Sequence, residues 1–195
     1  MTPPTMTPPR ILLLPGWLGS GDDHWQRRWA ALYGDTVVEQ ADWDLPRRGD
    51  WVARLEDVIL AQAEPVALVG HSLGCHLIDA WVGSSRHADR VACALLVAPP
   101  DLHGSTLPAA LHPWRRPLAQ PPLPFPATVA ASTDDPYCRY GAAKRLAERW
   151  GASCVDLGAC GHVNADSGLG DWPHGRSLLN DLIRLGGHAA VPLSH

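Results

Sequence analysis

Short apolar runs alternate with amphipathic segments along almost the whole chain, and this alternation restricts the possible folds most. The run at residues 91–98 (VACALLVA) is apolar throughout, which is typical of a strand in a parallel sheet with helices on both faces. Comparable runs predict five further strands, at residues 10–15, 36–40, 66–70, 127–132 and 153–157. The pattern predicts an α/β domain with a six-stranded, mostly parallel, doubly wound sheet.

Apolar residues recur at helical spacing in the segments around these strands. The spacing predicts helices at residues 22–33, 50–63, 73–82, 140–150 and 174–185. Asp22 is expected to cap the first of them. The 195 residues correspond to about one domain. We place that domain at residues 10–186, after a disordered lead-in at 1–9 and before a flexible tail at 187–195.

Composition and charge exclude several functional classes. The net charge of −4 argues against a sequence-independent nucleic-acid binder, which normally presents a basic face. No apolar run approaches the roughly 20 residues that cross a bilayer, and the first residues lack the apolar core of a signal peptide. Five cysteines without paired spacing indicate free thiols in a reducing compartment, so we expect a cytoplasmic protein. The chain lacks H-E-x-x-H and C-x-x-C, and we expect no metal or cofactor.

The sequence Gly70-His71-Ser72-Leu73-Gly74 follows a predicted strand and precedes a predicted helix. G-x-S-x-G in this setting is typical of a nucleophile elbow, a sharp turn that exposes a serine hydroxyl at the carboxyl end of a strand. The flanking glycines remove side chains that would clash with neighbouring elements. We therefore expect Ser72 to be a catalytic nucleophile rather than a simple helix cap.

A serine hydroxyl needs a base, and in this architecture the chain order is Ser, acid, His. Of the ten histidines, His162 follows the last predicted strand, where the base is expected. Asp135, before a proline and after the strand at 127–132, is the expected acid. Asp134 beside it and Asp101 after the strand at 91–98 remain alternatives.

Two main-chain N–H groups are expected to form an oxyanion hole. One belongs to Leu73, the residue after the nucleophile, and the other to Trp17 in the loop after the first strand. The glycines of that loop also allow a phosphate cradle. However, their order is G-x-x-G-x-G, and Asp22 stands where the P-loop needs a lysine, which argues against nucleotide binding.

Several motifs together resemble the small serine hydrolases related to retinoblastoma-binding protein nine, within the α/β-hydrolase superfamily. The matching motifs are Leu14-Pro15-Gly16, His24-Trp25-Gln26, Gly70-His71-Ser72-Leu73-Gly74, Asp134-Asp135-Pro136 and Gly161-His162-x-Asn164. The tract at 161–173 (GHVNADSGLGDWP) resembles the bacterial branch. The resemblance implies an α/β-hydrolase fold without a large lid domain, and it favours Asp135 over Asp134 as the acid. The retinoblastoma interaction does not transfer, because the chain has no L-x-C-x-E motif.

These observations predict a serine esterase or related acyl hydrolase that acts on a small acyl ester through an acyl-enzyme. Trp17 and Trp25 are expected to line an apolar acyl pocket. The segment at 99–126 carries nine of the nineteen prolines, so it is either a surface excursion or a rim over the active site. Two alternatives remain: a catalytically weak binding protein with this fold, and an acyltransferase or perhydrolase with the same triad. The sequence leaves the natural substrate and the oligomeric state open.

Overall fold

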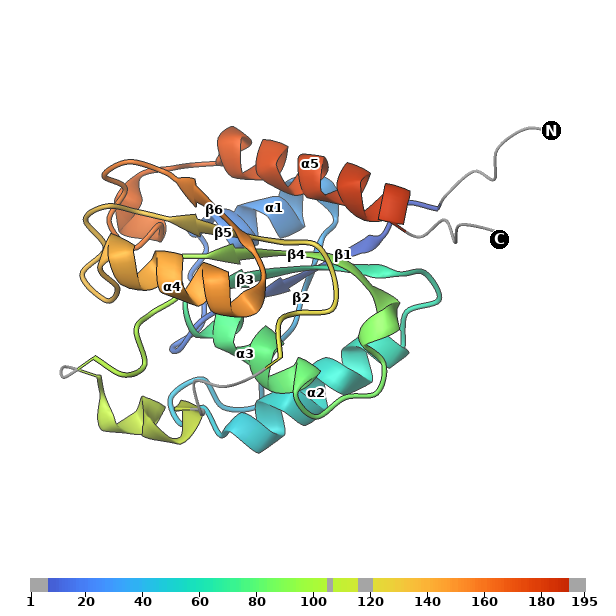
Figure 1. Cartoon of the computed structure of the whole chain (residues 1–195), viewed down its shortest axis with the longest axis horizontal. Helices are drawn as coiled ribbons and strands as arrows, with labels where there is room; N and C mark the ends of the chain where they lie inside the picture. Colours follow the sequence, from blue (N-terminus) through green and yellow to red (C-terminus); the bar gives the residue numbers. More distant parts are fainter. Residues whose placement is uncertain (1–6, 105–106, 116–120, 190–195) are drawn as a thin grey trace.

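The computed structural model describes residues 7–104, 107–115 and 121–189, with side chains described up to residue 186. Its sheet has six strands in the order β2-β1-β3-β4-β5-β6, and every adjacent pair is parallel (Figure 1). The strands are β1 (Arg10–Leu14), β2 (Thr36–Val37), β3 (Val66–His71), β4 (Val91–Val97), β5 (Ala127–Ala131) and β6 (Ser153–Asp156). The predicted α/β-hydrolase architecture, with helices on both faces and no large lid domain, is confirmed.

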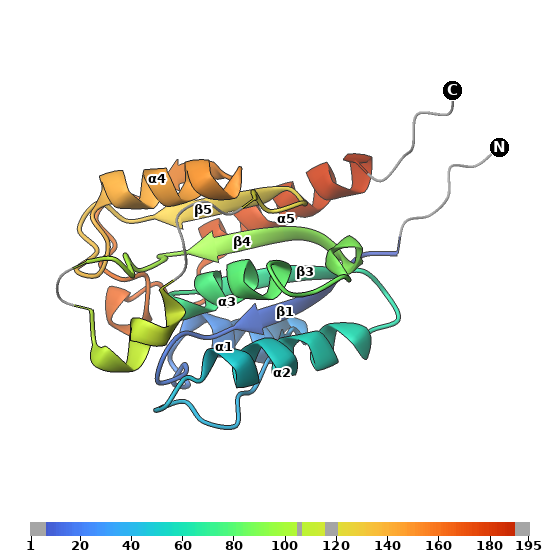
Figure 2. The same cartoon turned by 60° about the horizontal axis from the view of Figure 1, so that its bottom comes forward.

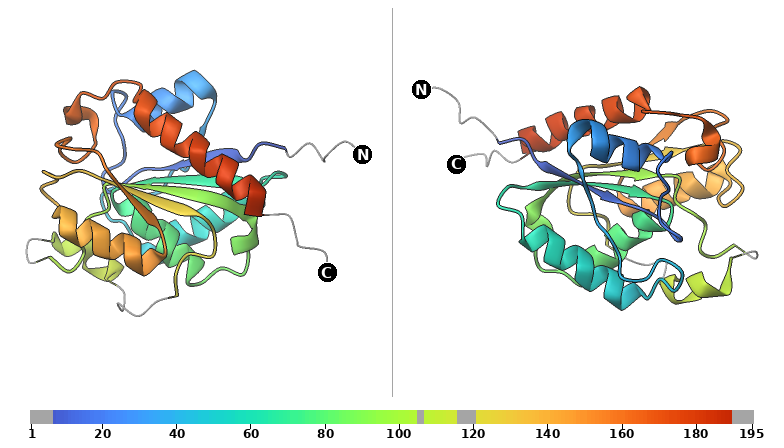
Figure 3. Two further views of the ribbon diagram at one scale, coloured as in Figure 1. Left: turned by 45° about the horizontal axis from the view of Figure 1, so that its top comes forward. Right: turned by 180° about the vertical axis from the view of Figure 1, so that it is seen from behind.

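Helices cover both faces of this sheet because the buried strands present apolar side chains to each side. The helices are α1 (Trp25–Tyr33), α2 (Arg48–Leu60), α3 (Leu73–Val82), α4 (Tyr140–Trp150) and α5 (Pro173–Ala189). One core contains side chains of α2, α3 and α4, and a second core on the opposite face contains side chains of α1 and α5. Figure 3 shows α1 and α5 together on their face of the sheet.

Several element ends differ from the sequence-based expectations. Helix α1 begins at Trp25, and His24 caps it through its ring nitrogen, so Asp22 is not the cap. Strand β2 has two residues rather than five, and α5 continues to Ala189 instead of ending at 185. The first residues of the expected tail at 187–195 are thus helical. Residues 1–6 of the expected lead-in and 190–195 of the tail lie outside the described residues.

The strand order reverses between β1 and β3, because the chain first moves outward to β2 and then returns to β3. In open parallel sheets, ligands bind at the carboxyl ends of the strands where this reversal occurs. Figure 2 shows the short 3₁₀ helix η2 (Ala109–Trp114), part of the proline-rich segment, beyond the arrowheads of the strands at this end. None of the helices in the described ranges is long and apolar enough to span a membrane.

Candidate active site

Ser72 lies on a strained turn between β3 and α3, with φ 53° and ψ −123°. Few non-glycine residues adopt a positive φ, and such strain persists only where the surroundings enforce it. Here the N–H of Ser72 donates to the carbonyl of Val97 on β4, 2.9 Å away. A Cβ atom at Gly70 would lie 2.8 Å from main-chain atoms of Gly74 and Cys75. Gly70 is therefore a steric requirement of the turn.

His162 brings the two other predicted residues together in one line of hydrogen bonds. Its Nε2 lies 2.9 Å from the Oγ of Ser72, and its Nδ1 lies 3.0 Å and 2.9 Å from the two carboxylate oxygens of Asp135. The Asp135 side chain is 2% exposed and that of His162 is 11% exposed. Because Nδ1 faces a carboxylate, it carries the ring proton, and Nε2 is left to accept from Ser72.

Asp134, the neighbouring alternative, forms its hydrogen bonds with groups other than the histidine ring. Its carboxylate accepts hydrogen bonds from the Ser132 hydroxyl and from the N–H of Gly161, both at 2.7 Å. These bonds, with the Ser132 hydroxyl first, lower the pKa of Asp134. Asp134 thus stabilises the loop that carries His162. Asp101, the other alternative, accepts from the N–H of His103 in a different turn.

The loop after β1 approaches Ser72 very closely. A Cβ atom at Gly16 would lie 2.7 Å from the Cβ of Ser72, so no larger residue fits there. The loop then makes a turn in which the N–H of Gly19 donates to the carbonyl of Gly16. The indole Nε1 of Trp17 donates to the carbonyl of Asp44, 2.9 Å away. Among the hydrogen bonds of the described residues, none uses the main-chain N–H of Trp17 or of Leu73.

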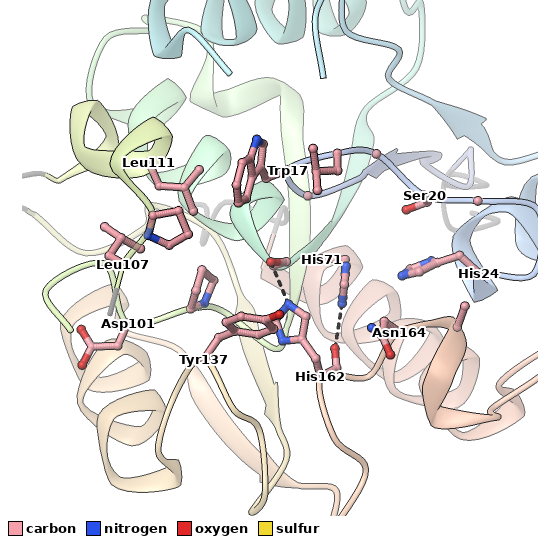
Figure 4. Close-up of a pocket in the computed structure, with 18 of the residues that line it drawn as sticks. Trp17, Ser20, His24, His71, Asp101, Leu107, Leu111, Tyr137, His162 and Asn164 are labelled. Carbon is pink, nitrogen blue, oxygen red and sulfur yellow. Dashed lines mark hydrogen bonds between the residues drawn. The ribbon is translucent and has the colours of Figure 1, made fainter. Parts of the chain in front are cut away.

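A cavity of about 380 Å³ opens above Ser72 and His162. Ligand cavities generally range from roughly 300 to 1,000 Å³, so this one suits a small molecule. We define its apolar wall as Trp17, Leu107, Pro108 and Leu111, and its polar wall as Ser20, His24 and Asn164. Figure 4 shows Trp17, Leu107 and Leu111 on one side of His162, and Ser20, His24 and Asn164 on the other.

The proline-rich segment supplies much of the apolar wall, which answers the question that the sequence left open. Leu107, Pro108 and Leu111 line the cavity together with Pro100 and Asp101. Trp114 anchors this segment: it is 1% exposed, and its indole Nε1 donates to the carbonyl of Pro46, 2.7 Å away. The described part of the segment is therefore a rim of the cavity.

A family model described as serine hydrolase matches residues 11–181. The chain belongs to the serine hydrolase family. A YdeN-like hydrolase from Pectobacterium atrosepticum is similar in structure, with 28% identity, a TM-score of 0.79, and coverage of 90% of this chain and 91% of that chain. The ydeN gene product of B. subtilis is 20% identical, with a TM-score of 0.70 and coverage of 90% and 99%. No match is found among the curated proteins.

A third similar structure is the type II thioesterase BorB from the borrelidin biosynthetic cluster. It is 21% identical, with a TM-score of 0.63, and 93% of each chain is covered. At this level of identity the likeness to BorB and to the ydeN product shows the fold alone. The region matched by the family model includes Ser72, Asp135 and His162.

Trp25 was expected to line an acyl pocket, but it does not line the cavity. Its side chain is 1% exposed and is absent from the cavity lining. The indole packs against Trp29 and Trp172 in the core between α1 and α5, and its Nε1 donates to the carbonyl of Val163, 2.8 Å away. Trp25 therefore supports the loop that carries His162 instead of lining an acyl pocket. Trp17 does line the cavity.

Sequence reasoning missed two histidines beside the site. His71 donates from Nε2 to the main-chain carbonyl of His162, 2.9 Å away, and its ring lies 4.6 Å from that of His24. Burial lowers the pKa of His71 well below its usual range and lowers that of His24 to about 4. Both rings are therefore neutral near pH 7. No local sequence pattern could reveal this contact, because His71 and His162 are 91 positions apart in the chain.

No cluster of three or more His, Cys, Asp or Glu side chains in the described part of the chain could hold a metal ion. We therefore assign no metal ligands. The site offers a hydroxyl, a base that can accept its proton, and a carboxylate that orients the base. Together these groups can support acyl transfer through the serine.

Proposed function

We propose that this chain is a serine esterase or closely related acyl hydrolase, with Ser72 as nucleophile, His162 as general base and Asp135 as the acid that orients it. The observation that carries the proposal is the unbroken line of hydrogen bonds from Asp135 through His162 to Ser72. This line ends at the floor of a cavity of suitable size. The substrate is a small neutral ester.

The reaction proceeds in two half-reactions. In the first, the Oγ of Ser72 bonds to the ester carbonyl carbon while its proton moves to Nε2 of His162. The carbonyl oxygen becomes an oxyanion, which the N–H groups of Leu73 and Trp17 stabilise. The intermediate collapses, the bond to the leaving alcohol breaks, and His162 gives the proton to that oxygen. In the second, water gives a proton to His162 while its oxygen bonds to the acyl carbon. The bond from that carbon to the Oγ of Ser72 then breaks, His162 returns the proton to Oγ, and the acid leaves.

The proposal extends to a position within the family and to a cellular location. The motifs at 70–74 and 161–164 support a position near the relatives of retinoblastoma-binding protein nine within the serine hydrolase family. All five cysteines are free, which supports a reducing, cytoplasmic location. The proposal involves no cofactor and no nucleic acid or membrane partner.

Labelling with a fluorophosphonate probe tests the proposal, because the probe reacts only with an activated serine. The wild-type protein should gain one probe molecule, and peptide mapping should place it on Ser72. The Ser72→Ala and His162→Ala variants should gain none. A folded wild-type protein that takes up no probe would contradict the proposal and would favour a binding protein with this fold.

A further inference from the structure

The three side chains of the polar wall present a defined set of donors and acceptors to the cavity. The Ser20 hydroxyl donates to Oε1 of Gln26, 3.1 Å away. Gln26 is itself fixed, because it is fully buried and its amide nitrogen donates to the carbonyls of Leu14 and Val69. Since a hydroxyl has one proton, Ser20 can offer only lone pairs to a ligand.

Asn164 is oriented by a capping box at the short 3₁₀ helix η3 (Ala165–Ser167). Its side-chain oxygen accepts from the main-chain N–H of Ser167, and the Ser167 hydroxyl accepts from the N–H of Asn164. This arrangement assigns the oxygen and leaves the amide NH₂ group as a donor. Figure 4 shows this side chain beside His71 and His162, on the cavity lining.

His24 adds a second donor. Its Nδ1 accepts from the N–H of Gln26, 3.2 Å away, so the proton of the neutral ring resides on Nε2. That Nε2 is buried and has no hydrogen-bond partner within the described ranges, although His24 is only 4% exposed and lines the cavity. A buried donor without a partner is costly, and an acceptor oxygen of a ligand would remove that cost.

We propose that the polar wall binds the leaving group of the substrate, and that this leaving group is a neutral alcohol with additional hydroxyl groups, of the glycerol type. The inference rests on the proposed function. A polyol hydroxyl accepts from Asn164 and His24 and donates to Ser20, which matches the two donors and one acceptor of the wall. An alkyl alcohol would leave these groups unpaired.

The assignment of the leaving group to this wall follows from the second half-reaction. The water that attacks the acyl-enzyme enters where the alcohol departed, next to His162, and a bound water needs two to four polar partners. The polar wall supplies such partners. The apolar wall of Trp17, Leu107, Pro108 and Leu111 suits the acyl chain instead.

The charges of the cavity support a neutral leaving group. Among the described residues that line the cavity none is a lysine or arginine, and the one carboxylate is that of Asp101, on the side of Leu107 (Figure 4). The low pKa of His24 keeps its ring uncharged near pH 7. A phosphate or carboxylate on the leaving group would find no cationic partner among these lining residues.

A matched pair of esters tests the inference. Glyceryl 1-monobutyrate and n-propyl butyrate share the acyl group and a three-carbon alcohol, and they differ by two hydroxyl groups. Two additional hydrogen bonds should raise kcat/KM for the glyceryl ester at least about tenfold. The Asn164→Ser variant keeps a capping oxygen but loses the amide donor, and it should reduce this ratio about fivefold. Ser20→Ala should reduce the ratio in the same direction.

A control variant on the apolar wall and a labelling experiment complete this test. Leu111→Ala, on the apolar wall, should change kcat/KM for both esters by the same factor and so preserve their ratio. Equal kcat/KM for the two esters in the wild type, or a ratio that neither Asn164→Ser nor Ser20→Ala changes, would overturn the inference. Fluorophosphonate labelling separates the two proposals, since it requires no alcohol. A wild type that labels at Ser72 but does not distinguish the esters contradicts only this inference.

Discussion

A Cβ atom at Gly74 would lie 2.1 Å from the main-chain carbonyl oxygen of Leu14. The first turn of α3 thus packs directly against the end of β1, the strand that leads into the loop of Trp17. Gly74 therefore allows the turn of Ser72 to lie close to the loop of Trp17, whose N–H is the second proposed oxyanion donor.

Gly74→Ala should destabilise the protein severely, because the added methyl group must displace backbone rather than a flexible side chain. We expect the free energy of unfolding to fall by about 3 kcal/mol, measured by urea denaturation. Gly49→Ala in α2 is the matched control, since a Cβ there meets nothing within 4 Å. This control should be neutral or stabilise the helix by about 1 kcal/mol. Equal stabilities of the two variants would contradict the packing described.

Asp135→Asn should lower kcat by about 10⁴-fold, because an amide does not hold the tautomer of His162 that leaves Nε2 free to accept. Asp134→Asn should lower kcat less than tenfold, since its carboxylate contacts Ser132 and Gly161 and not the histidine ring. Steady-state hydrolysis of p-nitrophenyl butyrate measures both. If Asp134→Asn were the more damaging change, the acid would have been assigned to the wrong residue.

The stability of the fold should fall as the pH decreases from about 6.5 towards 4. Burial lowers the pKa of both His24 and His76 to about 4, so below pH 6.5 the unfolded chain binds protons that the folded chain does not. Each of these histidines should cost about 2 kcal/mol at pH 5 relative to pH 7.5. Urea denaturation at the two pH values measures this loss.

His76→Gln isolates one of these contributions. The glutamine amide can still donate to the carbonyl of Pro100, which lies 2.8 Å from Nε2 of His76, but it does not titrate. The difference in stability between pH 7.5 and pH 5 should therefore shrink by about 2 kcal/mol. An unchanged difference would show that His76 is protonated in the folded protein at pH 5.

Trp25→Phe should weaken the fold without affecting substrate affinity. The variant loses the indole donor and leaves the buried carbonyl of Val163 unpaired, which should cost about 2 kcal/mol in urea denaturation. Because Trp25 does not line the cavity, KM should stay within about twofold, whereas kcat should fall because Val163 follows His162. A rise in KM with an unchanged kcat would indicate that Trp25 contacts substrate after all.

The fold was predictable from sequence because each strand and helix has a local signature. The apolar run at 91–98 and the G-x-S-x-G turn each depend on a few adjacent residues. The length of β2, which has two residues, was overestimated. The β-branched residues at 36–38 indicate strand propensity, but they do not show how many residues pair with the neighbouring strand. The continuation of α5 to Ala189 was missed for a similar reason, because Gly186 and Gly187 favour termination. Tertiary packing overrides this, and Gly186 lies against the carbonyl of Ala92.

The candidate site was predictable only where chain order constrains it. Ser72, Asp135 and His162 follow three strands whose carboxyl ends share one sheet edge. Chain order does not constrain the direction of a tryptophan side chain in this way: Trp17 lines the cavity, whereas Trp25, eight residues later, is buried in the core. Nor does sequence reveal that His24 and His71 lie in contact, since this contact joins the loop before α1 with the end of β3.

The central claim is that Ser72 forms an acyl-enzyme, and trapping that intermediate tests it most directly. Acid quenching during turnover of p-nitrophenyl butyrate, followed by mass spectrometry, should show one butyryl group on the peptide that contains Ser72. The His162→Ala and Ser72→Ala variants should show no adduct there. A wild type that hydrolyses the ester at full rate with the butyryl group on another residue, or with Ser72→Ala equally active, would contradict the claim.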